Sequence, residues 1–311
     1  MEKRELGKTG IYLSEIGLGT WAIGGPWEWG WGPQNDRESL EAIETALESG
    51  INWIDTAPSY GLGHSEEIIG KAIKGQREKI FLATKCGLVW EADGKIKNNN
   101  QPASIQKEVE NSLRRLGTDY IDLYQIHWPD PRTPLESSWE IMLKLKEQQK
   151  VRFVGVSNFN VRLLEKCEKI GRVDSLQPPY SLLDRRVETD ILPWCLENHT
   201  AVIAYSPLQN GLLSGKFDKS RLAPDDWRHK STFFKEPAFS KNLEFTENLK
   251  PLAGRHNKSV LQFAIAWVLM HPAVTAAIVG ARRASQVQEI MGAADWKLSE
   301  DDMAEVERVN R

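Results

Sequence analysis

The stretch Asn52-Trp53-Ile54-Asp55-Thr56-Ala57-Pro58-Ser59-Tyr60-Gly61 places an acid and a phenol just beyond a short apolar strand. Two later stretches have the same form: residues 81–85 end in a lysine, and residues 121–128 carry a histidine near their end. If the three are successive parallel strands, their carboxyl ends lie at one rim of the sheet. We therefore expect four side chains to meet at that rim: Asp55, Tyr60, Lys85 and His127.

The rest of the chain repeats this alternation of strand and helix. Short β-branched runs predict strands, amphipathic runs that end at Gly or Pro predict helices, and Ser104 is expected to cap the third helix. The predicted strands span residues 14–20, 52–56, 80–85, 120–127, 151–157, 175–177, 201–207 and 276–279. The predicted helices span residues 36–49, 64–74, 104–116, 135–149, 160–170, 188–198, 260–270 and 284–291.

This alternation fits either an open doubly wound sheet or a closed (β/α)8 TIM barrel. The count of eight, with no linker in mid-chain, favours an α/β barrel formed by a single domain over residues 1–311. Two glycines predict a small N-terminal β-hairpin within residues 3–13. Residues 210–248 are expected to form a long loop after the seventh strand, either a cover over a cofactor or a mobile surface insertion.

The composition is that of an ordinary soluble globular protein, with 41% hydrophobic and 27% charged residues. The 40 basic and 43 acidic residues nearly cancel, which argues against a nucleic acid or an anionic membrane as partner. Cys86, Cys167 and Cys195 are widely spaced, so we expect buried free thiols in a reducing compartment. No apolar run is long enough to span a bilayer. We expect a cytoplasmic protein, and a monomer, because a closed barrel has no exposed sheet edge.

The four rim residues suit the acid-assisted reduction of a carbonyl group. A tyrosine, with an ordinary pKa of about 10, releases a proton more easily beside a cation such as Lys85, and Asp55 favours the charged lysine. His127 can donate a hydrogen bond to the carbonyl oxygen. We find no spacing typical of a metal site and no Gly-x-Ser-x-Gly elbow, whereas a hydride from a nicotinamide fits. A barrel isomerase or a metal-dependent hydrolase is the alternative chemistry for such a rim.

Six short motifs occur in order along the chain: Gly17-Leu18-Gly19-Thr20-Trp21, Asp55-Thr56-Ala57 with Tyr60-Gly61, Thr84-Lys85, Ile126-His127, Gly155-Val156-Ser157-Asn158-Phe159 and Tyr205-Ser206-Pro207-Leu208. Together they resemble the motifs of the aldo-keto reductases, and the resemblance covers essentially the whole chain. The pattern is similar to the branch that contains the bacterial general-stress proteins and the potassium-channel β-subunits. It departs from many relatives at Val279, where they have proline, and at Gly280-Ala281, which replace a Lys-Ser pair of another branch.

The resemblance implies an NADPH-dependent oxidoreductase that reduces aldehydes, and also ketones, to alcohols. It implies that Tyr60 donates the proton, that Lys85 and Asp55 tune this tyrosine, and that His127 orients the carbonyl. It further implies a cofactor site formed by Thr20, Trp21, Asp55, Ser157, Asn158, Gln177, Tyr205, Ser206, Pro207, Leu208, Gly211, Leu213, Gly215, Lys216, Gly280, Arg282, Arg283, Gln286 and Glu289.

Three questions remain within this family: whether the cofactor is NADPH or NADH, what the substrate is, and whether the protein is an enzyme or a regulatory subunit. Arg282 and Arg283 predict NADPH rather than NADH, because a guanidinium suits a 2′-phosphate, and which of the two meets it is open. The sequence does not indicate the physiological substrate. The alternative function is an NADPH-binding regulatory subunit of the channel β-subunit type with little turnover. Indoles near the rim predict an aromatic substrate pocket formed by Trp21, Trp29, Trp90 and Trp128.

Overall fold

Parallel strands close into an eight-stranded barrel in the computed structural model, which describes residues 1–309 apart from the side chain of residue 221. Around the barrel the strands follow the order β10-β11-β12-β3-β4-β5-β8-β9, and β9 pairs with β10 to complete the circle. The predicted barrel is therefore confirmed. The strands are β3 (Ile16–Gly19), β4 (Trp53–Asp55), β5 (Phe81–Cys86), β8 (Ile121–Ile126), β9 (Val151–Ser157), β10 (Ser175–Gln177), β11 (Ala201–Ala204) and β12 (Val274–Gly280).

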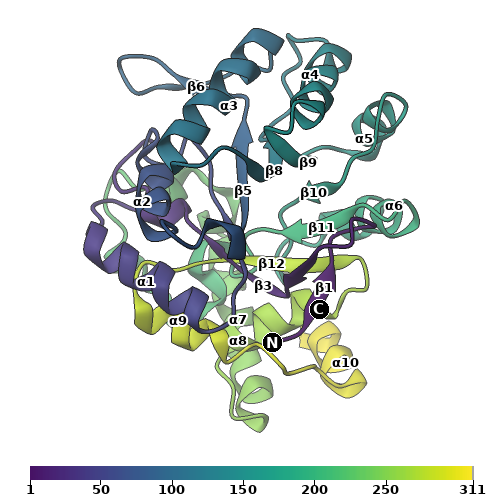
Figure 1. Cartoon of the computed structure of the whole chain (residues 1–311). Coiled ribbons are helices and arrows are strands. Elements are labelled where there is room, and N and C mark those ends of the chain that lie inside the picture. The colour runs from purple at the N-terminus through teal and green to yellow at the C-terminus, as the bar shows by residue number, and fades with distance from the viewer. Residues whose placement is uncertain (310–311) are drawn as a thin grey trace.

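Helices surround the barrel in the arrangement that Figure 1 shows. The predicted helices are α1 (Asp36–Glu48), α2 (His64–Ala72), α3 (Pro102–Leu116), α4 (Leu135–Glu147), α5 (Val161–Glu168), α6 (Ile191–Glu197), α8 (Val260–Met270) and α9 (Ala284–Met291). Two of their starts differ from the prediction by more than one residue. Helix α3 begins at Pro102, which suits a first helical position, so Ser104 is inside the helix and donates to Glu108 instead of capping. Helix α6 begins at Ile191, after a separate 3-10 turn over Arg186–Glu188.

The N-terminal hairpin is present as β1 (Lys3–Glu5) and β2 (Tyr12–Ser14), which pair antiparallel. A second hairpin, β6 (Leu88–Trp90) with β7 (Ile96–Asn98), follows β5 and was not predicted. The expected long loop is also more ordered than predicted. It holds 3-10 turns and a small core of Leu212, Phe234 and Phe239, and helix α7 (Ala238–Arg255) begins inside it. A last helix, α10 (Glu300–Val309), covers a segment that the sequence analysis left unassigned.

Two hydrophobic cores follow from the alternation of side chains along each strand. Phe81 and Ala83 of β5 belong to the core inside the barrel, whereas Leu82 of the same strand packs in the larger core between barrel and helices. Leu6 and Leu13 of the first hairpin join the inner core. On the same alternation the next inward residue of β5 is a lysine, at the carboxyl end of the strand where barrel sites lie.

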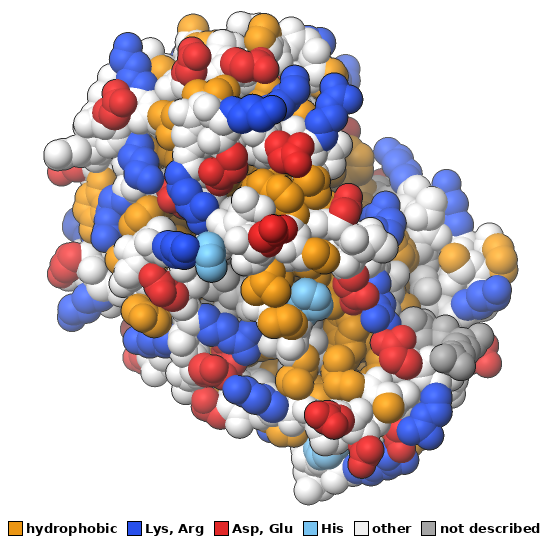
Figure 2. Space-filling view, turned by 90° about the vertical axis from the view of Figure 1, so that its right-hand side faces the viewer, with side chains coloured by type: hydrophobic (Ala, Val, Ile, Leu, Met, Phe, Trp, Pro, Cys, Tyr) orange, Lys and Arg blue, Asp and Glu red, His pale blue; other side chains and the backbone are white. Residues whose placement is uncertain are grey.

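The surface carries charge of both signs. Figure 2 shows acidic and basic side chains interspersed over the displayed face, with hydrophobic side chains scattered between them. Cys86, Cys167 and Cys195 are free and buried. Within the part of the chain that the structure describes, no helix combines the length and the apolar character that crossing a bilayer requires.

Trp53 fills the barrel interior and sets the first stability prediction. Its side chain is fully buried, its Nε1 donates to the Ser14 carbonyl at 2.9 Å, and a Cβ on Gly17 would come within 2.0 Å of its ring. We expect Trp53→Ala to lower the free energy of unfolding by about 3–5 kcal/mol, because it removes a large buried ring and leaves a cavity. Urea unfolding followed by circular dichroism measures this change.

A tryptophan at the surface provides the control for this measurement. Trp29 is 38% exposed, and we expect Trp29→Ala to lower the free energy of unfolding by less than about 1 kcal/mol. Equal losses in the two variants would show that the inner core does not depend on Trp53.

Candidate active site

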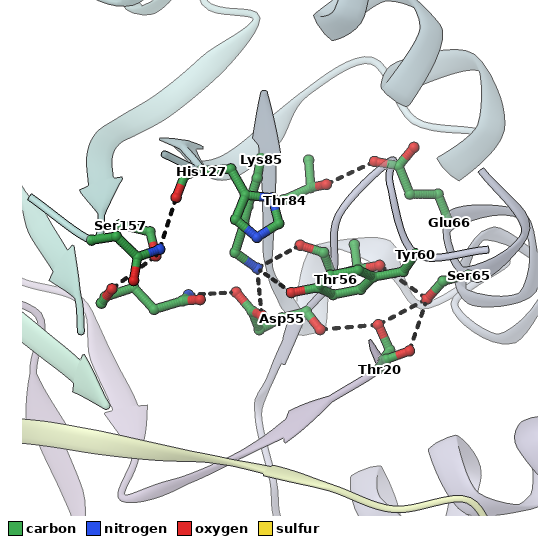
Figure 3. A network of polar contacts seen from close by, with 12 residues as sticks. Thr20, Asp55, Thr56, Tyr60, Ser65, Glu66, Thr84, Lys85, His127 and Ser157 are labelled. Carbon is green, nitrogen blue, oxygen red and sulfur yellow. Dashed lines mark hydrogen bonds and ion pairs between the residues drawn. The ribbon is translucent and has the colours of Figure 1, made fainter. Parts of the chain in front are cut away.

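The four residues predicted from strand ends lie together at the rim of the barrel (Figure 3). The Lys85 side chain is fully buried, and its Nζ donates to Asp55 Oδ1 at 2.6 Å, to the Thr56 carbonyl at 2.9 Å and to the Tyr60 hydroxyl at 3.2 Å. The ring of His127 meets the ring of Tyr60 edge-on, with centroids 5.9 Å apart. One ammonium therefore binds an acid, a backbone carbonyl and a phenol.

The loop between β4 and α2 holds Tyr60 in place by close backbone packing. The Tyr60 amide donates to the Ala57 carbonyl at 3.1 Å, which makes a tight turn after the strand. Gly61 has a φ of 63°, and a Cβ there would lie 1.9 Å from the Gly24 carbonyl oxygen. Only glycine fits this approach, so the turn that carries Tyr60 is fixed against the loop that follows β3.

Burial dominates the electrostatics of the lysine and the tyrosine. It lowers the pKa of Lys85, and the neighbouring Asp55 carboxylate opposes this effect. Burial also raises the pKa of Tyr60 well above its ordinary value, and the charge of Asp55 raises it further. Tyr60 is thus a neutral phenol that carries a proton over the whole physiological range, and the Lys85 cation lies where a tyrosinate would form.

His127 follows β8, and its backbone amide donates to the Cys86 carbonyl at 2.9 Å. Burial lowers the pKa of this imidazole well below its ordinary value, and the charge of Lys85 adds to the effect. The ring is therefore neutral at physiological pH. A neutral imidazole can still donate one N–H to a carbonyl oxygen.

Hydrogen bonds connect Asp55 to the next strands around the rim. Gln177 Nε2 donates to Asp55 Oδ2 at 2.8 Å, and Ser157 Oγ donates to the Gln177 carbonyl at 2.8 Å. Asn158, with a φ of 64°, donates through Nδ2 to the His127 carbonyl at 3.0 Å and accepts from the Tyr205 hydroxyl at 2.8 Å. The ends of β4, β8, β9, β10 and β11 are thus joined in one polar network.

A cavity of about 990 Å³ opens above this network. Most of the residues predicted for cofactor and substrate line it. They are Thr20, Trp21, Asp55, Ser157, Asn158, Gln177, Tyr205, Ser206, Pro207, Leu208, Gly211, Lys216, Gly280, Arg282, Gln286 and Glu289 together with Tyr60, His127, Trp29 and Trp128.

Four of the residues predicted to bind cofactor or substrate do not line this cavity. Leu213 is fully buried in the outer core, and Gly215 packs against Val260. Arg283 is exposed and pairs with Glu38 at 3.3 Å. Trp90 was expected in the substrate pocket, but β6 directs it to a separate cavity of about 530 Å³, where the Arg115 guanidinium lies 5.9 Å from its ring centroid.

Several residues of the cavity wall were missed in the sequence. Leu88, Ile96 and Asn98 come from the second hairpin, and Leu222 and Arg228 come from the loop after β11. Trp227 packs on Trp21 with ring centroids 5.3 Å apart, so this loop meets the loop after β3. The Asp93-Gly94 pair between two apolar runs is a hairpin signal that could have revealed the first group.

The donor set of the cavity fits a nicotinamide dinucleotide better than a metal. Within residues 1–309, no group of three or more His, Cys, Asp or Glu side chains is arranged to hold a metal ion. The cavity is instead lined by Tyr60 and His127, by the amide side chains of Asn158 and Gln177 and by Arg282, together with apolar and aromatic side chains. A few polar groups in a largely apolar cleft of this volume suit an organic ligand with several polar parts.

Comparison with known proteins gives one consistent result. The family model described as "Aldo/keto reductase family" matches residues 15–311. The chain is 41% identical to aldo-keto reductase YhdN of Bacillus subtilis, over 99% of this chain and 93% of the relative, and 38% identical to the NADH-specific methylglyoxal reductase of Escherichia coli, over 97% and 96%. The glycerol dehydrogenase AKR11B4 from Gluconobacter oxydans superimposes with a TM-score of 0.91 at 40% identity, over 99% of this chain and 94% of that chain. This protein therefore belongs to the aldo/keto reductase family and is an oxidoreductase with a (β/α)8 barrel.

Proposed function

We propose that this protein reduces aldehydes and ketones to alcohols with NADPH, and that Tyr60 is the proton donor. The observation that carries the proposal is the contact of Lys85 Nζ with the Tyr60 hydroxyl at 3.2 Å, at the floor of a cavity that His127 also lines. A carbonyl oxygen placed between the Tyr60 hydroxyl and the His127 ring would meet two hydrogen-bond donors. These donors polarise the carbonyl and stabilise the negative charge that develops on its oxygen.

Each polar group has a distinct part in this reaction. When bound, the nicotinamide supplies a hydride to the carbonyl carbon. The carbonyl oxygen takes the proton of Tyr60 and becomes a hydroxyl group, and the tyrosinate that remains is stabilised by the Lys85 cation and regains a proton from water. Asp55 keeps Lys85 charged in its buried position. His127 holds the oxygen through a neutral N–H.

The wall of the cavity favours substrates without charge near the carbonyl. Trp21, Trp27, Trp29, Trp31 and Trp128 line it, so most of the substrate contact is aromatic. The Arg228 guanidinium is occupied by Asp226 at 2.7 Å and by the ring of Trp31 at 4.6 Å. It is therefore not free to select an anion.

Turnover is favoured over a regulatory role. The relatives with the highest identities reported above are named reductases, and the similar structure is named a dehydrogenase. The four polar rim residues are also in mutual contact, an arrangement that binding alone would not need.

The proposed preference for NADPH rests on the positive charge at the cavity wall. Among the relatives, one is named NADH-specific and another is named with NADP(+), so the family supports both cofactors. Arg282 lines the cavity and is partly occupied by Gln34, with its Nε donating at 2.6 Å. Arg283 lies beside it and is 67% exposed. We propose that Arg282 meets the 2′-phosphate and that Arg283 adds to the local positive potential.

Replacing Tyr60 with phenylalanine tests the mechanism directly. We expect Tyr60→Phe to reduce turnover by about 10²- to 10⁴-fold, because the ring remains and the proton is lost. The loss of NADPH absorbance with a panel of aliphatic, aromatic and dicarbonyl aldehydes measures turnover, and a fluorescence titration confirms that cofactor binding is kept. Near-normal turnover in this variant would show that another group delivers the proton.

The pH dependence of reduction tests the state of His127. Because the pKa of this imidazole is lowered well below its ordinary value, the neutral form persists as pH falls through the range where a free histidine gains a proton. We expect kcat/KM to stay level between about pH 6 and 7.5. A decline centred near the ordinary histidine pKa would indicate that His127 titrates there.

Alanine variants of the two arginines test cofactor choice. We expect Arg282→Ala to weaken NADPH binding about 10- to 100-fold more than NADH binding, since a charged hydrogen bond contributes about 1.5–3 kcal/mol. Arg283→Ala is expected to act in the same direction with a smaller effect. The readout is the ratio of the two affinities, because Arg282 also contacts the loop after β3. An unchanged ratio in both variants would contradict NADPH selection by these residues.

A further inference from the structure

A second buried carboxylate lies behind the proposed proton donor. Glu66 of α2 is fully buried, and its Oε1 accepts a hydrogen bond from Thr84 Oγ1 at 2.7 Å. Its Oε2 pairs with Arg115 of α3, through Nε at 2.7 Å and through the terminal nitrogen at 2.6 Å. The carboxylate thus connects two helices to strand β5.

The alternation along β5 brings Glu66 close to the reaction without any contact with the cavity. Thr84 points outward to the helices, whereas the next residue, Lys85, points inward. In Figure 3, Thr84 reaches toward Glu66 while Lys85 extends toward Asp55 and Tyr60. Glu66 therefore holds the strand at the residue directly before the lysine.

The preceding residue of α2 holds the neighbouring strand end. Ser65 Oγ donates to the Thr20 hydroxyl at 2.9 Å and shares a hydrogen bond of 3.1 Å with the Thr56 hydroxyl. The Thr56 carbonyl is itself an acceptor for Lys85. Two consecutive residues of α2 thus contact the neighbours of Lys85. Ser65 binds Thr56 through a neutral hydroxyl, and Glu66 binds Thr84 through a charged carboxylate.

Of these two residues, only Glu66 carries a charge that can act on the protonation of Lys85. Burial lowers the pKa of Lys85, and the carboxylates of Asp55 and Glu66 oppose that effect. The other titratable groups that face the lysine are the neutral Tyr60 and His127. Asp55 acts from the cavity side, so Glu66 is the anion that acts from the helix layer.

The titratable groups around Glu66 are few. Arg115 pairs with it directly from α3. Glu108, on the same helix, has a pKa raised to about 7 by burial, while the Gly87 amide donates to it at 2.9 Å. Tyr124 of β8 and Cys86 of β5 are buried, and burial raises the pKa of each, so both stay neutral.

We propose that Glu66 is a positioning residue of the reaction: its buried carboxylate, held by Thr84 and Arg115, keeps Lys85 a cation in contact with Tyr60. This inference rests on the proposed function, in which Tyr60 donates the proton beside a charged lysine. Glu66 touches neither substrate nor cofactor in this scheme, and it acts through Lys85 alone.

The test is the pH dependence of kcat/KM in Glu66→Gln, with Glu66→Asp as the matched control. Reduction needs both a protonated Tyr60 and a charged Lys85, so activity declines as pH rises. Loss of the Glu66 charge favours proton loss from Lys85, so the decline moves to lower pH. We expect kcat/KM on the alkaline side to fall about three- to tenfold further than in the parent, with a smaller loss at acidic pH.

The aspartate variant separates charge from packing. Glu66→Asp retains the negative charge but shortens the side chain, so it disturbs the contact with Thr84 more than Glu66→Gln does. We expect it to lower the melting temperature while the alkaline decline stays at the parent pH. An equal movement of the decline in both variants would assign the effect to packing and would overturn the proposal.

Two further variants complete the experiment. If Glu66→Gln does not fold because Arg115 is left unpaired, the double variant Glu66→Gln/Arg115→Gln removes both charges together. Its decline is expected to move in the same direction but less far, because the Arg115 cation that opposes the Glu66 charge is lost with it. An unmoved alkaline decline in the folded variant overturns the proposal. Tyr60→Phe is measured in parallel: if it keeps near-normal turnover, the proposed function fails, whereas an inactive Tyr60→Phe with an unmoved decline in Glu66→Gln removes only this inference.

Discussion

The burial of the Lys85 ammonium group determines which groups must surround it in this site. Lys85 has no exposed surface, and a buried cation without partners would destabilise the fold by several kcal/mol or lose its proton. The structure supplies a carboxylate at 2.6 Å, a carbonyl at 2.9 Å and a phenol at 3.2 Å. All three partners come from the single stretch 55–60, which begins at the last residue of β4. The closeness of β4 and β5 in the barrel is therefore a condition for keeping the lysine charged.

The barrel provides this closeness through strand register. Asp55 lies opposite Ala83 in the pairing of β4 with β5, so Lys85 extends two residues further along the same inward face. The same parity places Trp53 and Phe81 deeper in the barrel, where they form its apolar core. A shift of one residue in either strand would exchange the inner and outer faces. The apolar residues deeper in the barrel thus fix the positions of the polar residues at its rim.

The sequence was informative where function depends on the order of residues along the chain. Asp55, Lys85 and His127 stand at or just past the ends of apolar runs, and barrel topology alone brings such ends together. Trp90 lines a separate cavity because its position depends on the second hairpin, which was not predicted and which directs this side chain toward Arg115. Helix α7 was missed because the aromatic residues of its segment pack into a small core of their own, a contact that periodicity does not indicate. Glu66 could not be distinguished from other helix carboxylates until Thr84 and Arg115 were seen on either side of it.

Asp55 connects the Lys85–Tyr60 pair to Gln177 on the other side of the rim. Neither the positions of the strand ends nor the sequence motifs indicate this connection. One of its oxygens accepts from Lys85 and the other accepts from Gln177, which belongs to the cofactor site that the family resemblance implies. The side chain is 3% exposed, so neither hydrogen bond has water as a ready substitute. A change in the position of Gln177 on cofactor binding would therefore act on the carboxylate that holds Lys85 charged. The position of Gln177 and the charge of Lys85 are thus coupled through one shared acceptor, because the two hydrogen bonds use the two oxygens of a single carboxylate.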